Sequence, residues 1–156
     1  EEKEEEKVLR CLKCGMETTE KDGLCMKCKS KSALANLANM IAEHEKMGLN
    51  LNKIKLMYNS AVGMYKAGDY SGAYENAGRT EEELLRNKKY YDYVMRELDY
   101  CENRIDAITR AGMDTTQMNN IVWLINSFME KGEYDKAYAY VTKLKALVEK
   151  ASEDLV

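Results

Sequence analysis

Hydrophobic residues recur every three or four positions along most of the chain after residue 31, which is the period of an amphipathic α-helix. Glycines interrupt this pattern at Gly48, Gly68, Gly112 and Gly132, where turns between helices are expected. The pattern therefore predicts a mainly α-helical body, with helices over 32–47, 50–67, 70–87, 90–111, 115–131 and 134–152.

The third and fourth of these segments are expected to form one helix. Small and apolar residues follow each other in steps of three and four from Tyr70 to Ile108, and nothing between Gly78 and Gly112 would stop a helix. The result would be a central helix of roughly 40 residues, about 60 Å long, with a coiled-coil-like seam. Because such a helix cannot bury its apolar stripe against itself, other helices must lie along it. The absence of proline from the whole chain agrees with an all-helical body.

A shift of 64 residues places Gly48 on Gly112 and Gly68 on Gly132, and the apolar positions of the two halves coincide as well. We interpret this as a duplicated unit, with a helical body over 32–156 that divides into repeats over 32–89 and 90–153. The arrangement resembles tandem three-helix bundles of the spectrin type that share a long central helix. The phrases Lys-Ala-Gly-Asp-Tyr-Ser-Gly-Ala-Tyr and Glu-Lys-Gly-Glu-Tyr-Asp-Lys-Ala-Tyr also resemble the turns of tetratricopeptide and microtubule-interacting-and-transport hairpins.

Four cysteines near the start of the chain form two C-x-x-C pairs separated by ten residues. At this spacing two tight turns can direct four sulfurs at one tetrahedral ion, and four sulfur ligands leave no coordination position for a catalytic water. We therefore predict a structural Zn²⁺ site. A redox dithiol, an iron–sulfur site and a pair of disulfides are the alternatives. The predicted ligands are Cys11, Cys14, Cys25 and Cys28.

The stretch from Val8 to Lys31 resembles the short zinc ribbons at the front of many archaeal and bacterial proteins, whose usual pattern is C-P-x-C-G repeated after a spacer. The chain keeps Gly15 after the first pair, but it has Leu12 and Met26 in place of the two prolines. The resemblance implies a small zinc-binding module over residues 7–31. It does not imply one activity, because members of this family bind nucleic acid, bind proteins or cap another domain.

Charge is distributed unevenly over a chain whose net charge is −3. Residues 1–6 are five glutamates and one lysine, which predicts an acidic, disordered tail. Residues 7–31 are mildly basic, so the ribbon is compatible with phosphate contacts, although it has no arginine-rich stripe. If the ribbon binds nucleic acid, the candidate contacts are Lys13, Lys27 and Lys29.

No pattern in the chain indicates catalysis. His44, the only histidine, has no partner at ligand or dyad spacing, and Cys101 lies on the helical seam, where a buried thiol is expected. The chain is therefore expected not to be an enzyme. The absence of a long apolar run or secretory signal, together with the odd cysteine, predicts a reducing, cytoplasmic location.

The aromatic residues suggest that the chain binds a protein partner. The chain has 11 tyrosines beside one phenylalanine and one tryptophan. Trp123 is either a packing anchor or a surface hot spot, and we favour packing. Tyrosines at the edge of the seam either pack between helices or contact a partner. We predict a zinc-binding adaptor or scaffold whose helical body binds a protein partner, with a nucleic-acid-associated factor as the alternative. Tyrosines expected in the core are Tyr70, Tyr74, Tyr91, Tyr134 and Tyr138, and those expected at or off the edge are Tyr90, Tyr93, Tyr100 and Tyr140.

Overall fold

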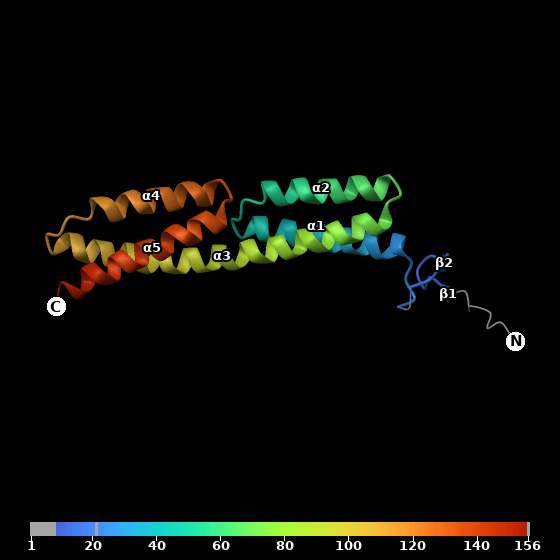
Figure 1. Cartoon of the computed structure of the whole chain (residues 1–156), viewed down its shortest axis with the longest axis horizontal. Helices are drawn as coiled ribbons and strands as arrows, with labels where there is room; N and C mark the ends of the chain where they lie inside the picture. Colours follow the sequence, from blue (N-terminus) through green and yellow to red (C-terminus); the bar gives the residue numbers. More distant parts are fainter. Residues whose placement is uncertain (1–8, 21, 156) are drawn as a thin grey trace, which may run out of the picture. The chain divides into compact units, whose positions relative to one another are not determined.

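A computed structural model describes residues 9–20 and 22–155, and within them the protein is mainly α-helical (Figure 1). The predicted acidic tail over residues 1–6 lies outside the described residues. A small antiparallel sheet pairs β1 (Leu9–Arg10) with β2 (Glu17–Thr18). The helices that follow are α1 (Met26–Lys46), α2 (Asn52–Lys66), α3 (Tyr70–Arg110), α4 (Thr116–Glu130) and α5 (Tyr134–Glu153).

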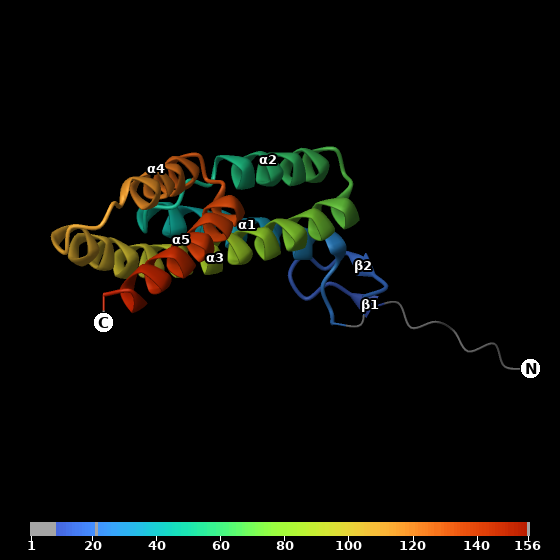
Figure 2. The same ribbon diagram turned by 60° about the vertical axis from the view of Figure 1, so that its left-hand side comes forward.

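The chain divides into two compact units, each built around three helical segments. The first unit comprises residues 1–43 and 53–83, and it packs α1 and α2 beside the first part of α3 (Figures 1 and 2). Buried side chains from all three segments fill its interior. They are Leu34, Leu37, Ile41, Ile54, Ala61, Ala73, Ala77 and Thr80.

The second unit comprises residues 44–52 and 84–156, in which α4 and α5 pack along the rest of α3. The short segment that joins α1 to α2 therefore belongs to this unit, and it buries Leu49 and Leu51 there. The main core cluster draws on all three helical segments of the unit. It contains Val94, Leu98, Cys101, Ile105, Ile108, Met118, Ile125, Ala137, Val141, Leu144, Val148 and Ala151.

The predicted central helix is confirmed as α3, which runs without a break for 41 residues. Its first turn is capped by Asp69, whose carboxylate accepts a hydrogen bond from the backbone N–H of Gly72 at 3.0 Å. Asp114, with Gln117 three residues after it, has the pattern of an N-cap and its capping-box partner, which predicts Asp114 as the N-cap of α4. In the structure Thr115 occupies that position, and Asp114 accepts instead from the backbone N–H of Thr116.

Positions 64 residues apart match in burial and backbone conformation. Ala73 and Ala137 are both fully buried, and Gly68 and Gly132 both have positive φ, at 86° and 74°. These matches agree with the predicted duplication, which stays a prediction, as does the resemblance to spectrin-type bundles.

Three expectations about aromatic side chains are wrong. Trp123 is 69% exposed and lies on the outer side of α4, and Tyr74 and Tyr138 are exposed as well. Each sits on a helix whose other apolar residues already supply a full buried stripe, so the extra aromatic ring is left outside. Tyr134, by contrast, is confirmed as a core residue.

No helix among the described residues is long and apolar enough to cross a membrane.

Candidate metal centre

The first cysteine pair lies in a turn that the β1–β2 hairpin closes. Cys11 follows β1 directly, and its backbone N–H donates to the carbonyl of Met16 at 2.8 Å. The N–H of Gly15 donates back to the carbonyl of Cys11 at 2.9 Å. Gly15 has a φ of 74°, a conformation that glycine adopts without strain, which explains why it follows the pair. This tight turn directs the sulfurs of Cys11 and Cys14 to the same side.

The second pair forms the start of helix α1. Cys25 precedes the helix, its Sγ accepts the backbone N–H of Cys28 at 3.4 Å, and its carbonyl accepts the N–H of Lys29 at 2.9 Å. The cysteine thus takes the role of an N-cap residue. Because the first turn of a helix carries unpaired N–H groups and a partial positive charge, it favours a negatively charged sulfur there. Figure 2 shows the hairpin beside this end of α1.

A backbone contact joins the two pairs. The N–H of Leu12, inside the first pair, donates to the carbonyl of Gly23 at 2.7 Å. This hydrogen bond holds the segment just before the second pair against the first pair. Gly23 has a φ of 81°, and a Cβ atom there would lie 3.0 Å from the Leu12 side chain. The local sequence therefore favours the close approach of the two C-x-x-C turns.

The four sulfurs meet in one cluster. The Sγ atoms of Cys11, Cys14, Cys25 and Cys28 all lie within 4.8 Å of one another, and those of Cys14 and Cys25 are 3.6 Å apart. None of these cysteines forms a disulfide. A tetrahedral zinc ion with four sulfur ligands separates its sulfurs by about 3.8 Å, so the cluster has the size that such an ion requires. Within residues 9–20 and 22–155, it is the one group of metal-ligating side chains that meets this distance criterion.

The protonation of the cluster agrees with a site for a cation. Hydrogen bonds from backbone N–H groups, first of all that of Cys25, lower the pKa of Cys11 to about 6. Hydrogen bonding to the Cys25 and Cys14 side chains raises the pKa of Cys28 to about 12. Four neighbouring thiols cannot all ionise while they face each other alone, so they share protons. A divalent cation would replace those protons and allow all four sulfurs to become ligands.

Around the cluster, Lys29 joins helix α1 to the spacer between the two pairs. Its Nζ atom lies 2.7 Å from a carboxylate oxygen of Asp22 and 3.2 Å from one of Glu20, and only 15% of its side chain is exposed. The hydrogen bond to Asp22 raises the pKa of Lys29, and the same hydrogen bond lowers the pKa of Asp22. The lysine therefore holds the spacer against the helix.

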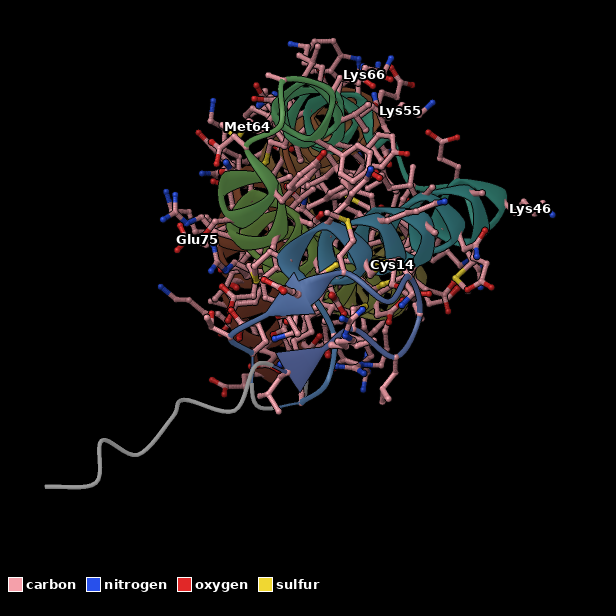
Figure 3. The ribbon with its side chains drawn as sticks, turned by 90° about the vertical axis from the view of Figure 1, so that its right-hand side faces the viewer. Cys14, Lys46, Lys55, Met64, Lys66 and Glu75 are labelled. Carbon is pink, nitrogen blue, oxygen red and sulfur yellow. The ribbon has the colours of Figure 1, made fainter. Side chains whose placement is uncertain are left out.

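The three lysines proposed as phosphate contacts are placed differently. Lys29 is held between two carboxylates, as described. Lys13 is exposed and donates to the Ser32 hydroxyl at 2.7 Å, whereas Lys27 is exposed and lies over the ring of Tyr70, 5.8 Å from its centre. Figure 3 labels Cys14, which lies beside helix α1.

Two features of the site were not predicted from the sequence. Helix α1 begins at Met26, not at residue 32, so the second cysteine pair is part of the helix start. The carboxylates that hold Lys29 were also missed. The acidic residues of the spacer, Glu20 and Asp22, were the signal that could have indicated this ion pair.

Comparisons with protein-family models, with curated proteins and with solved structures find no match to this chain. The function must therefore be argued from its own residues.

Proposed function

We propose that this protein is a non-enzymatic adaptor, in which a structural zinc ion holds the start of a helical scaffold and the scaffold binds a protein partner. The observation that carries the zinc assignment is the cluster of four sulfurs within 4.8 Å of one another. Zn²⁺ is preferred over iron because it takes four thiolates in a closed tetrahedral site without needing redox chemistry. Such a site has a structural role, since no ligand position is left for a substrate.

A cytoplasmic location forms part of the proposal. The four cysteines are unpaired, and a fifth, Cys101, is free and fully buried. Zinc–thiolate sites and free thiols persist in reducing compartments.

The binding of a protein partner is supported by aromatic and arginine side chains on the second unit. We call them the tyrosine surface. Tyr138 of α5 contacts Tyr90 and Tyr93 of α3, with ring centres 5.1 and 5.0 Å apart. Arginines lie over two of the rings. The surface comprises Tyr90, Tyr93, Tyr100, Tyr138, Arg96 and Arg104.

The arrangement of this surface suits protein recognition. The guanidinium of Arg96 lies 5.4 Å from the centre of the Tyr93 ring, and that of Arg104 lies 5.6 Å from that of Tyr100. Stacking on a ring holds an arginine in place, so less side-chain entropy is lost when it binds a carboxylate. Tyrosine and arginine are also the residues that contribute most to protein interfaces. We therefore expect a partner segment that carries acidic side chains.

The test is affinity capture from the native cell with the intact chain and two variants. A Tyr100→Ala/Tyr138→Ala variant removes two exposed rings of the tyrosine surface, and Leu56→Ala removes a 70% exposed side chain from α2 as a matched control. We expect the intact chain and the control to retain the same partner and the tyrosine variant to lose it. Equal capture by all three proteins would contradict the proposed surface.

The alternative function is nucleic-acid association through the ribbon, supported by the exposure of Lys13 and Lys27. It predicts a mobility shift at low salt that a Lys13→Ala/Lys27→Ala variant loses, with binding that weakens steeply as salt rises. A Lys29→Ala variant should bind as the intact chain does, because the amino group of Lys29 already contacts Asp22 and Glu20. We rank this function second because Lys29, one of its three candidate contacts, is already paired with two carboxylates.

A further inference from the structure

Helix α4 differs from the rest of the protein in its lack of charge. Between Thr115 and Met129, 15 consecutive residues include no aspartate, glutamate, lysine or arginine, although these residues make up 33% of the chain. Surface helices normally carry charges on the side that faces water. The centre of a protein interface, by contrast, is depleted of charge and enriched in aromatic residues.

The exposed side of α4 is organised around its tryptophan. The helix buries Met118 and Ile125 in the core of the second unit. Trp123 is 69% exposed, and it is the largest of the exposed hydrophobic side chains of this helix. Small polar side chains surround it. We call this set the α4 face, and it comprises Thr116, Asn119, Asn120, Trp123, Asn126, Ser127 and Glu130.

We propose that the α4 face binds the same face of a second copy of this chain, with the two α4 helices antiparallel and Trp123 at the two-fold axis. Asn119 and Asn120 lie four and three residues before Trp123, whereas Asn126 and Ser127 lie three and four residues after it. Asn119 and Asn126 are seven residues apart, so they lie on one side of Trp123 on the helix, and Asn120 and Ser127 lie on the other side. A two-fold axis through Trp123 places each side against the same side of the second copy, so Asn119 faces Asn126 of the second copy with an offset of one residue. It also sets Asn120 opposite Ser127 of the second copy in the same way, and each pair occurs twice.

The chemistry of these pairs favours a second copy over a different partner. An asparagine amide both donates and accepts, so two amides or an amide and a hydroxyl satisfy each other. The amide N–H of Asn119 already donates to Thr115 at 3.4 Å, but its carbonyl oxygen and second N–H can still serve the pairing. A symmetric contact brings identical residues near each other, which is unfavourable where those residues carry a charge. The side chains around Trp123 are uncharged, so this cost does not arise there.

Helix α2, which occupies the matching place in the first unit, provides a contrast. Its exposed residues include Lys53, Lys55 and Lys66, and Figure 3 shows Lys55 and Lys66 on its outer side. Bringing two such faces together would oppose like charges. Of these two helices, α4 is thus the one suited to pairing with itself.

The first experiment measures association of the full-length chain. One helix pair buries little area, so we expect a dimer with a Kd on the order of 10–100 μM. Sedimentation equilibrium between about 1 μM and about 1 mM should show the mass rising from one chain towards two. Because Trp123 is the only tryptophan, its emission should shift to shorter wavelength over the same concentration range.

Variants of exposed residues test the surface. Trp123→Ala should remain a monomer throughout this range, and the Leu56→Ala control, which alters an equally exposed site on α2, should dimerise as the intact chain does. Circular dichroism should show that both variants fold. A monomeric intact chain at the highest concentration would overturn the proposal, as would unchanged dimerisation of Trp123→Ala. Loss of a different captured protein by Trp123→Ala, with the intact chain monomeric, would assign the face to that protein instead.

A charge pair tests the antiparallel register. In an Asn119→Lys/Asn126→Glu variant, each introduced lysine would face a glutamate of the second copy, so dimerisation should strengthen severalfold at low salt and lose this gain at high salt. The matched Asn119→Lys/Asn126→Lys variant should dimerise at least tenfold more weakly. Equal association of the two variants would overturn the proposed arrangement.

Discussion

The hydroxyl of Tyr134 accepts a hydrogen bond from the backbone N–H of Asn50 at 2.6 Å, although 84 residues separate the two in sequence. The side chain of Asn50 reaches the same region and donates to the carbonyl of Glu130 at 2.7 Å. Tyr134 is 1% exposed, and its ring packs edge-on against Tyr91. Within the second unit, the segment 44–52 is thus fixed to the start of α5 and the end of α4 by two hydrogen bonds of Asn50.

We expect Tyr134→Phe to lower the free energy of unfolding by about 1–3 kcal/mol, because it leaves the N–H of Asn50 without its acceptor while keeping the ring in place. Urea unfolding at neutral pH measures this change. Tyr140→Phe provides the control, since the Tyr140 ring stacks on Phe128 and the substitution keeps that ring. A Tyr134 variant as stable as the control would show that the hydrogen bond contributes little.

The same hydroxyl predicts a pH dependence. Burial, the largest cause, raises the pKa of Tyr134 above its ordinary value of 10.0. The folded protein therefore retains this proton at a pH where the unfolded chain releases it. The contribution to stability is complete below about pH 10 and falls as the pH rises through the folded-state pKa. Above pH 10 the intact chain should lose stability more steeply than Tyr134→Phe, as measured by urea unfolding at a series of pH values. Parallel curves would exclude Tyr134 as the source.

Two features require glycine at position 132: a positive φ and a close contact with the backbone of Asn50. Its φ is 74°, and a Cβ atom there would lie 2.7 Å from the carbonyl oxygen of Asn50. At Gly68, the φ is 86° but no atom lies within 4 Å of such a Cβ. Gly68→Ala should cost about 1 kcal/mol of unfolding free energy from the backbone alone. Gly132→Ala should cost at least about 1 kcal/mol more, since the clash is with backbone. Thermal or urea unfolding of the two variants compares them, and equal losses would argue against the contact.

The sequence predicted the long helices well because their evidence is local and repeated. From Tyr70 to Arg110 each turn supplies a small or apolar residue on one side and no residue breaks the helix, so α3 could be predicted to within a few residues. The clustering of the four cysteine sulfurs was equally predictable, because two C-x-x-C pairs fix their own local geometry.

What the sequence did not predict depends on contacts between segments. Spacing places Trp123 on the side of its helix away from Ile121 and Ile125, but its neighbours Val122 and Leu124 are apolar as well. The sequence alone therefore could not tell whether another helix covers that side. The start of α1 was placed too late because Cys25 was considered only as a ligand, whereas it also caps the helix. Lys29 was assigned to phosphates because its carboxylate partners lie seven and nine residues away, beyond the reach of a local pattern.

Removal of the metal should affect the front of α1 before the rest of the body. Because Cys25 and Cys28 lie at the helix start, chelation should release the cap and unfold the ribbon and the first turns of α1, while most helical signal remains. Hydrogen exchange should increase over about residues 9–32 and change little in the core of the second unit.

Metal analysis provides the companion measurement. The intact chain should bind one zinc ion per chain, and Cys25→Ser should lose most of it. Cys101→Ser should keep it, because that cysteine lies in the separate core cluster of the second unit. Full zinc content in Cys25→Ser, or uniform exchange throughout the chain after chelation, would contradict the proposed site.

Thiol reactivity should divide the five cysteines into two classes. Burial, and next the neighbouring charge of Glu97, raises the pKa of Cys101 to about 11, and the side chain is 0% exposed. Since the thiolate is the reactive form, Cys101 should be inert in the folded protein. A chromogenic disulfide reagent should therefore react rapidly with no thiol in the zinc-bound chain and with four thiols after chelation. The fifth thiol, that of Cys101, should react only in denaturant. Cys101→Ser should give the same first two results and no fifth thiol. A fifth fast thiol in the folded, chelated chain would mean that the core around Cys101 opens readily, and the buried thiol would then need another explanation.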